Sequence, residues 1–229
     1  MDGPTSHRCH PLSYPYPLVV FDLDGTLVDS AADIAEALNR TLEDIGVARV
    51  PETTVLGWIG DGVRRLVEQA VHAAGREVDL AAVMPVFMVH YRECLLRSPR
   101  LFDGVADALA QLRARNVPLA ICTNKPEALV PPLLQHLGIG DAFALVLGGD
   151  SLPQRKPSGE PLRHIAAHFG VPVDACLMVG DSLTDYRAAE EAGMPIALVR
   201  YGYPRGLDLA TAHAVAVIDD LRELPGLQR

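Results

Sequence analysis

The residues best suited to chemistry in this chain are acidic, and they follow short apolar segments. Asp22 and Asp24 come directly after one such segment, and Asp181 and Asp185 follow another. The carboxyl ends of parallel strands meet at one edge of an open sheet, so we expect these side chains to lie close together. Clustered carboxylates repel one another and have raised pKa values unless a divalent cation neutralises them. Oxygen ligands of this kind suit Mg²⁺, which is commonly shared with a phosphate.

Hydrogen-bond donors follow two further apolar segments. Thr123 and Asn124 come after one of them, and Lys156 lies in a loop beyond the next. A hydroxyl, an amide and an ammonium suit the oxygens of a phosphoryl group. Each short motif alone is more typical of a turn, but their recurrence at four successive segment ends favours a catalytic site.

The elements that must position these residues alternate between strand and helix. The apolar runs predict strands at residues 18–21, 119–122, 143–147, 177–179, 196–199 and 215–218, and helical periods cover 105–115, 162–169 and 184–192. This alternation is typical of a Rossmann-like α/β fold, in which helices cover both faces of a parallel sheet.

A helical domain is predicted between the first and second strands. Ser30 and Asp33 have the spacing of a capping box, a second helix is expected after Gly62, and a third carries Phe87 and Tyr91. We therefore expect a flexible extension at residues 1–17, an α/β core at 18–29 and 100–229, and a helical cap at 30–99.

Three prolines lie within predicted helices. Pro85 falls in the third cap helix, and Pro131 and Pro132 fall in the helix after Lys125. At each place we expect the helix to start late or to kink.

Composition excludes several classes of partner. The chain has 29 acidic and 20 basic residues, so a nucleic acid or an anionic membrane surface is not expected to bind. No apolar run is long enough for a membrane span or a signal peptide, and the four cysteines form no CxxC pair, so we expect a cytoplasmic protein with reduced thiols. The histidines show no ligand-like cluster, which disfavours zinc.

Four segments together resemble the motifs of the haloacid dehalogenase superfamily of phosphatases. They are FDLDGTLVDS, CTNKPEALV, RKPSGEPL and VGDSLTDYRAAEEAG, and the similarity runs over residues 18–220. GWIGDGVRRLVEQA, LGGDSLPQRKP and YGYPRG are more similar to the phosphoglycolate phosphatases than to sugar phosphatases or mutases. The lysine motif departs from the common pattern at Ser158 and Gly159, which puts loop rigidity in question and leaves the lysine in place.

The resemblance implies a role for each matching residue. Asp22 would be the nucleophile that forms an aspartyl phosphate, and Asp24 would be the general acid and base. Mg²⁺ would be bound by the side chain of Asp22, the backbone carbonyl of Asp24 and the carboxylate of Asp181, with support from Asp185. The transferring phosphoryl group would be held by Thr123, the backbone of Asn124, and Lys156.

In the superfamily the cap closes over the site and touches the leaving group. The best candidate here is the loop at residues 57–62, with Gly60, Asp61 and Gly62, and the arginines that follow it, Arg64 and Arg65. One arginine would meet the carboxylate of a small acid such as glycolate; the alternative is that both lie on a solvent-exposed face. Lys125 is expected to be solvated or to face the cap. If neither arginine meets the carboxylate, the next candidates are Lys125 and the backbone N–H groups of residues 60–62 at a helix N-terminus.

We therefore predict a Mg²⁺-dependent phosphatase that converts 2-phosphoglycolate to glycolate and phosphate, as a monomer or homodimer. The alternative is a phosphatase or mutase for another small phosphate ester, such as a sugar phosphate. A phosphorylated signalling receiver is disfavoured because it would have neither the helical insertion nor a second acidic motif after the lysine. The complete set of catalytic residue types argues against an inactive binding module.

Overall fold

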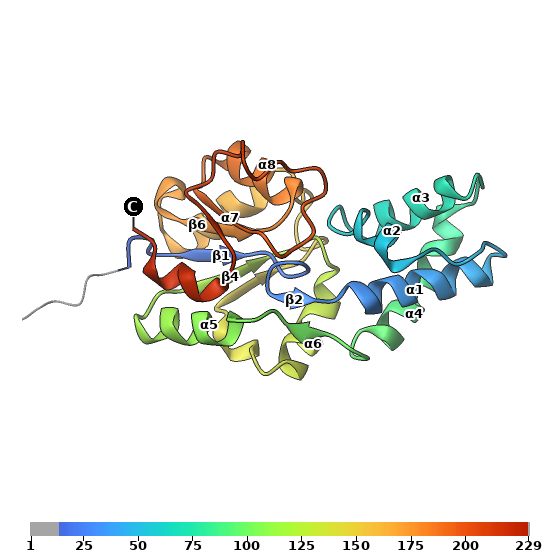
Figure 1. Ribbon diagram of the computed structural model, residues 1–229, viewed down its shortest axis with the longest axis horizontal. Helices are drawn as coiled ribbons and strands as arrows, with labels where there is room; N and C mark the ends of the chain where they lie inside the picture. The colour runs from blue at the N-terminus through green and yellow to red at the C-terminus, as the bar shows by residue number, and fades with distance from the viewer. Residues whose placement is uncertain (1–13, 229) are drawn as a thin grey trace, which may run out of the picture.

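Six parallel strands form the centre of the structure, a computed structural model that describes residues 14–228. Their order is β5, β4, β1, β6, β7, β8, which places β1 in the middle (Figure 1). The strands are β1 Val19–Phe21, β4 Leu119–Cys122, β5 Leu145–Leu147, β6 Leu177–Gly180, β7 Ile196–Val199 and β8 Ala216–Ile218. The predicted parallel α/β sheet is confirmed. The third predicted strand starts two residues late, because the 3₁₀ turn η2 Gly140–Ala142 precedes it.

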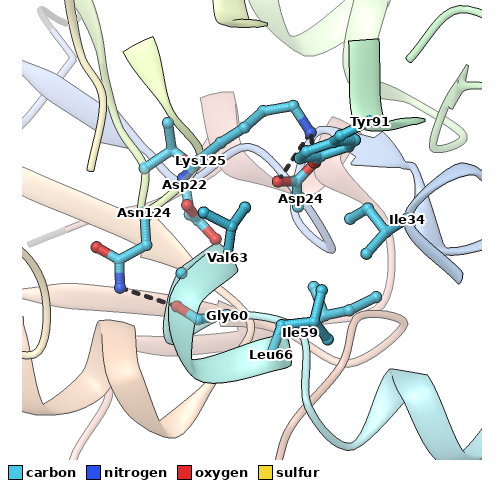
Figure 2. Close-up of a pocket in the computed structure, with 12 residues that line it drawn as sticks. Asp22, Asp24, Ile34, Ile59, Gly60, Val63, Leu66, Tyr91, Asn124 and Lys125 are labelled. Carbon is cyan, nitrogen blue, oxygen red and sulfur yellow. Dashed lines mark hydrogen bonds and ion pairs between the residues drawn. The ribbon is translucent and has the colours of Figure 1, made fainter. Parts of the chain in front are cut away.

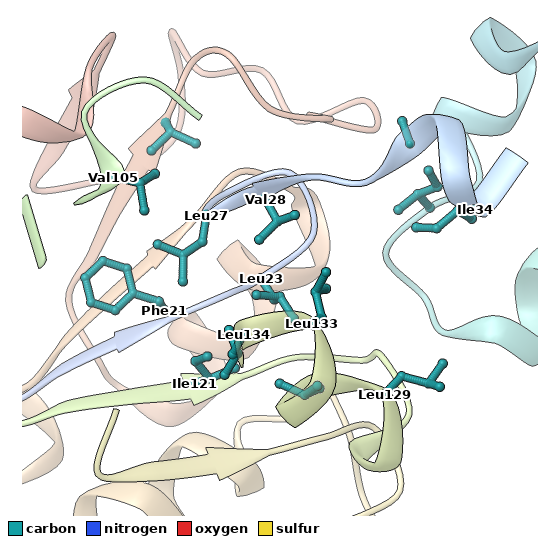
Figure 3. Close-up of a cluster of buried hydrophobic side chains, with 14 of the residues drawn as sticks. Phe21, Leu23, Leu27, Val28, Ile34, Val105, Ile121, Leu129, Leu133 and Leu134 are labelled. Carbon is teal, nitrogen blue, oxygen red and sulfur yellow. The ribbon is translucent and has the colours of Figure 1, made fainter. Parts of the chain in front are cut away.

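Both faces of the sheet are covered, as its apolar runs require. Val19 and Phe21 of β1 pack into one core cluster, while Leu18 and Val20 pack into the other, because successive side chains of a strand point to opposite faces. Figure 3 shows the first cluster around β1. The helices over that face are α5 Val105–Ala114 and α6 Val130–His136, and those over the other are α7 Glu160–Phe169 and α8 Leu183–Ala192.

Four helices gather beyond one end of the sheet (Figure 1). They are α1 Ala31–Asp44, α2 Glu52–Leu56, α3 Val63–Ala73 and α4 Leu80–Cys94. α1 packs along α4, and the single-turn helix α2 was not predicted. We call these four helices and their connecting loops the cap.

Two short antiparallel strands link the cap to the core. β2 Val28–Asp29 pairs with β3 Arg100–Leu101, and the Arg100 guanidinium donates to the Asp29 carboxylate at 2.6 Å. Neither strand was predicted, because each has only two residues and no apolar run. Their pairing places the segment that enters the cap beside the segment that leaves it.

The predicted capping box at Ser30 and Asp33 is wrong. The Ser30 hydroxyl donates to Asp24 Oδ1 at 2.6 Å, and the Asp33 carboxylate accepts hydrogen bonds from the hydroxyl and backbone N–H of Ser98. No side-chain bond caps the first turn of α1. Tertiary partners therefore take both side chains away from the helix end.

The prolines have different effects. The 3₁₀ turn η1 Glu127–Leu129 precedes α6, whose first turn contains Pro131 and Pro132, so the predicted late start is confirmed. α4 begins at Leu80 and includes Pro85, so it does not start late.

The core begins before residue 18. Tyr14 and Tyr16 are buried in the first core cluster, and the Tyr14 hydroxyl donates to the carbonyl of Leu224 at 3.1 Å, in the terminal 3₁₀ segment η4 Leu221–Gly226. The boundary of the predicted extension therefore moves to before Tyr14, and residues 1–13 lie outside the described part. Among the described residues, no helix has both the length and the apolar character needed to span a bilayer.

Candidate active site

The carboxyl edge of the sheet brings together the acidic and basic residues that the sequence singled out. Asp22 follows β1, and Asp181 and Asp185 follow β6; all three are buried. The buried ammonium of Lys156 donates to Asp22 Oδ1 at 2.7 Å and to Asp185 Oδ1 at 2.6 Å. Residues far apart in the chain thus form one charged cluster.

Three carboxylates in this cluster lie close enough to share a cation. One oxygen each from Asp22, Asp181 and Asp185 lies within 4.8 Å of the others. Burial, followed by the charge of Asp185, raises the pKa of Asp22 to about 7 despite Lys156. Burial and the charges of Asp185 and Asp22 also raise the pKa of Asp181. One ammonium cannot balance three carboxylates, so the donor set fits a divalent cation with oxygen ligands.

Asp181 is held from both sides. The Thr26 hydroxyl donates to its Oδ1 at 2.7 Å, and the backbone N–H of Tyr203 donates to its Oδ2 at 2.7 Å. Gly25 and Gly202 approach so closely that a Cβ on either would overlap the Asp181 side chain. This packing fixes the direction in which the carboxylate points.

Asp185 positions Lys156 while it caps a helix. Its Oδ2 accepts hydrogen bonds from the Ser182 hydroxyl at 2.7 Å and the Ser182 backbone N–H at 3.1 Å, in the capping box that starts α8. Its Oδ1 accepts the hydrogen bond from Lys156. A carboxylate fixed by a helix N-terminus therefore directs the lysine toward Asp22.

The Asp24 side chain interacts with a different set of residues (Figure 2). Its Oδ1 accepts hydrogen bonds from the Ser30 hydroxyl at 2.6 Å and the Lys125 ammonium at 3.0 Å. Lys125 also donates to the hydroxyl of Tyr91, which comes from cap helix α4. Of the two expected positions of Lys125, solvated or facing the cap, the structure shows the second: its ammonium is buried between Asp24 and Tyr91 of the cap.

Asn124 joins the cap loop to the segment that carries Lys156. Its side-chain amide donates to the carbonyl oxygens of Gly60 and Lys156, each at 2.8 Å. Thr123 is buried beside it, and its hydroxyl oxygen accepts from the Lys125 backbone N–H at 3.2 Å. The two residues that follow β4 therefore face the same space as Asp22.

A pocket lies between these core residues and the cap. The empty volume of this pocket, which includes its open mouth, is about 410 Å³. Asp22 and Asp24 lie on its core side with Thr123 and Asn124. The cap side is mainly apolar and is lined by Ile34, Ile59, Val63 and Leu66 (Figure 2).

The predicted cap residues separate into two groups. Gly60 and Gly62 line the pocket, with φ angles of +123° and +88° that suit glycine. Asp61 does not line it; its carboxylate accepts from the Arg205 guanidinium at 2.5 Å and the Thr184 hydroxyl at 2.8 Å.

Arg64 and Arg65 are exposed and lie outside the pocket lining. Arg65 pairs with Glu68 one turn along α3 at 2.5 Å. Both arginines occupy the face of α3 opposite buried Leu66 and Val67. The structure therefore does not bring them to the other site residues.

Sequence reasoning gave no site role to Ser30, Tyr91, Tyr203 or Arg205. Ser30 was assigned to a helix end, Tyr91 to the apolar stripe of a helix, and Tyr203 and Arg205 to a motif quoted only for its resemblance. The phenol hydroxyl of Tyr203 donates to Asp29 at 2.9 Å, so this loop also braces the segment after β1. For Tyr203 and Arg205, the only feature of the sequence that could have indicated a site role was the density of polar and aromatic residues in YGYPRG.

Comparisons with known proteins match most of the chain. Residues 16–193 match the family model of the haloacid dehalogenase-like hydrolases. A phosphoglycolate phosphatase encoded on a plasmid of Cupriavidus necator is 43% identical over 218 residues, which cover 94% of each chain. A phosphoglycolate phosphatase of Colwellia psychrerythraea is 39% identical over 198 residues, 84% of this chain and 88% of the relative.

Among solved structures, a predicted phosphoglycolate phosphatase from Haemophilus somnus is similar throughout. It superposes with a TM-score of 0.86 at 34% identity, covering 92% of this chain and 96% of its own. The similarity thus includes both the sheet and the inserted helices.

Proposed function

Because this chain belongs to the haloacid dehalogenase-like hydrolase family, we propose that it hydrolyses 2-phosphoglycolate through an aspartyl phosphate on Asp22, with Mg²⁺ as cofactor. It is a hydrolase of the phosphoglycolate phosphatase type, related to curated phosphatases over most of its length. The observation that carries the mechanism is the convergence of Asp22, Asp24, Lys156 and Asp181 at one sheet edge.

Two steps complete the reaction. An oxygen of Asp22 attacks phosphorus as the ester P–O bond breaks, and Asp24 donates its proton to the departing oxygen of glycolate. Asp24 then accepts a proton from water, which attacks the aspartyl phosphate, releases phosphate and restores Asp22. Covalent capture divides one difficult hydrolysis into two easier steps.

The remaining residues would stabilise the charge of the phosphoryl group and orient it toward Asp22. Lys156 and Thr123 would bind oxygens of the transferring phosphoryl group. The side chain of Asn124, next to Thr123, donates to the Lys156 carbonyl oxygen and so holds the two segments together. Asp22, Asp181, Asp185 and the carbonyl of Asp24 would hold Mg²⁺, which supplies charge neutralisation when it is bound.

The pocket wall favours a short acid over a sugar as the leaving group. Ile34, Ile59, Val63 and Leu66 offer no hydrogen-bond partners, and a buried sugar hydroxyl left without one is costly. For this reason the sugar phosphate alternative is less well supported. We take the enzyme to act in the cytoplasm, as a monomer or homodimer, in keeping with the sequence.

Trapping the covalent intermediate tests the proposal. Acid quenching during turnover of 2-phosphoglycolate with Mg²⁺ should add one phosphoryl group to the peptide that contains Asp22, as detected by mass spectrometry. Chelator, or the Asp22→Asn substitution, should abolish both the adduct and phosphate release. Undiminished phosphate release by Asp22→Asn would show that the nucleophile lies elsewhere.

A further inference from the structure

We propose that the Lys125 ammonium, together with the Tyr91 hydroxyl, binds the carboxylate of the substrate and makes the enzyme selective for phosphate esters of short acids. This inference rests on the proposed function and assigns its selectivity to residues of both domains. Lys125 comes from the loop after β4, and Tyr91 comes from cap helix α4.

Lys125 is the only cationic side chain among the described residues that line the pocket. The other charged side chains in the lining are Asp22 and Asp24, and the cap wall is mainly apolar. A substrate carboxylate in this space would face two carboxylates and hydrocarbon unless the ammonium met it. Since a buried charge without a partner is strongly unfavourable, Lys125 has the position that an acidic leaving group requires.

The place of Lys125 beside Asp24 matches the shape of the leaving group. Asp24 must lie within hydrogen-bond reach of the ester oxygen to give it a proton. In 2-phosphoglycolate the carboxyl carbon is only two bonds from that oxygen. The ammonium lies 3.0 Å from Asp24 Oδ1, so a carboxylate two bonds beyond the ester oxygen comes within its reach.

The ammonium can also donate to a further partner. Lysine has three N–H donors, and the hydrogen-bond partners of Lys125 Nζ are the Asp24 carboxylate and the Tyr91 hydroxyl. The ammonium lies closer to Asp24 Oδ1 than to Asp24 Oδ2, so one of its donors serves Asp24 and a second serves Tyr91. The third donor remains for a substrate oxygen. The Tyr91 ring centroid lies 4.7 Å from Nζ, so the ring and the hydroxyl both hold the ammonium at the pocket.

Other basic side chains near the cap are less suitable. Arg64 and Arg65 are exposed outside the pocket lining, and Arg155 is also exposed. Arg205 pairs with Asp61, and Lys156 pairs with Asp22 and Asp185. None of these five residues lines the pocket, whereas Lys125 does.

The test compares two esters that differ only in the group Lys125 would bind. Ethyl phosphate has a methyl group where 2-phosphoglycolate has its carboxylate, and both release an alkoxide from the same phosphoryl site. The measured quantity is the ratio of kcat/KM for 2-phosphoglycolate to kcat/KM for ethyl phosphate. Because the intrinsic reactivity of each ester is the same for every variant, a change in this ratio between variants isolates the carboxylate contact.

Lys125→Met should lower the ratio roughly 30-fold or more, the scale of a desolvated charged hydrogen bond, while it also slows both esters because Asp24 loses a partner. Tyr91→Phe keeps the ring and should lower the ratio several-fold. Arg92→Met is the matched control. It removes an exposed positive charge from α4, the helix that carries Tyr91, and should leave the ratio unchanged. Equal losses on both esters in Lys125→Met, or a drop in the ratio in Arg64→Met or Arg65→Met instead, would overturn the proposal.

Binding gives a readout that does not depend on turnover. In an Asp22→Asn background, calorimetry should show that Lys125→Met weakens binding of 2-phosphoglycolate much more than binding of ethyl phosphate. Equal weakening of both ligands contradicts the carboxylate contact. If wild-type enzyme hydrolyses neither ester, the proposed function itself fails; if it hydrolyses both but does not prefer 2-phosphoglycolate, the substrate assignment fails.

Discussion

Arg205, in the loop after β7, forms an ion pair with Asp61 of the cap, with 2.5 Å between Nη2 and Oδ2. The Thr184 hydroxyl of α8 donates to the same carboxylate at 2.8 Å. The hydrogen bond from Asn124 to Gly60 lies one residue away along the cap loop. The core thus holds this loop at consecutive positions, where Gly60 and Gly62 line the pocket.

Removing the Arg205 guanidinium should therefore loosen the contact between the cap loop and the core. The hydrogen bond and charge of Arg205 lower the pKa of Asp61, so the pair is charged at neutral pH. A partly shielded ion pair contributes on the order of 1 kcal/mol, so Arg205→Met should lower kcat/KM for 2-phosphoglycolate about fivefold. Faster hydrogen exchange over residues 59–62 should accompany the loss. Adding Asp61→Asn should cost little more, because the two side chains share one interaction; fully additive losses would contradict the coupling.

Asp24→Asn should separate acid–base catalysis from the other functions of the loop after β1. The amide keeps the shape and the backbone carbonyl of Asp24 but cannot deliver a proton, so turnover of 2-phosphoglycolate should fall by roughly 100-fold or more. The phosphoenzyme on Asp22 should still form, slowly, and should persist longer because its hydrolysis also needs a base. Steady-state kinetics and acid-quench trapping measure the two effects. Near-normal turnover would contradict the role of Asp24.

Much of the fold was accessible from sequence because the four inner strands of the main sheet, β1, β4, β6 and β7, are short apolar runs buried on both faces. Strands β1, β4 and β6 match the predicted segments to within one residue, and the residues after them fall at one edge because parallel strands end together. The polar positions at these ends, Asp22, Thr123 and Asp181 among them, could thus be predicted to meet without any knowledge of the cap.

The contacts between cap and core were not predictable in this way. Tyr91 and Lys125 lie 34 residues apart in the chain, and their contact depends on how α4 docks onto the core, which no local pattern encodes. Ser30 shows how a local rule can fail: its spacing to Asp33 suits a capping box, yet the nearby Asp24 carboxylate takes its hydroxyl instead. Lys125 and Tyr91, which we propose to set the substrate selectivity, are of this second kind.

Ser30→Ala tests a residue that the sequence assigned only to a helix end. Its hydroxyl donates to Asp24 Oδ1 at 2.6 Å, beside the bond from Lys125. Without it the Asp24 side chain is less firmly oriented, and kcat should fall roughly tenfold, while stability should change little because the hydroxyl does not cap α1. Kinetics and thermal unfolding check the two parts. A large loss of stability with normal kcat in the folded fraction would contradict a positioning role.

Magnesium binding should release protons near neutral pH. Burial raises the pKa of Asp22 to about 7 and also raises that of Asp181, so the metal-free protein holds protons that a cation must displace. The affinity for Mg²⁺ should therefore increase as pH rises through about 7. Calorimetry in two buffers of different ionisation enthalpy measures the protons released, and we expect more at pH about 6 than at pH about 8. A pH-independent affinity without proton release would contradict the raised pKa values.

Gly202→Ala should weaken metal binding without touching a ligand. A Cβ at this position would overlap the Asp181 side chain and the Gly25 carbonyl oxygen, and because the latter is backbone, Asp181 or the loop must shift. Residues that orient metal ligands typically affect affinity by 10- to 100-fold, so the Mg²⁺ concentration for half-maximal activity should rise roughly tenfold or more. Gly226→Ala is the matched control, since a Cβ there meets no atom within 4 Å and its φ is not in the left-handed region. If both variants need the same Mg²⁺ concentration as the wild type, the close packing of Gly202 does not orient Asp181.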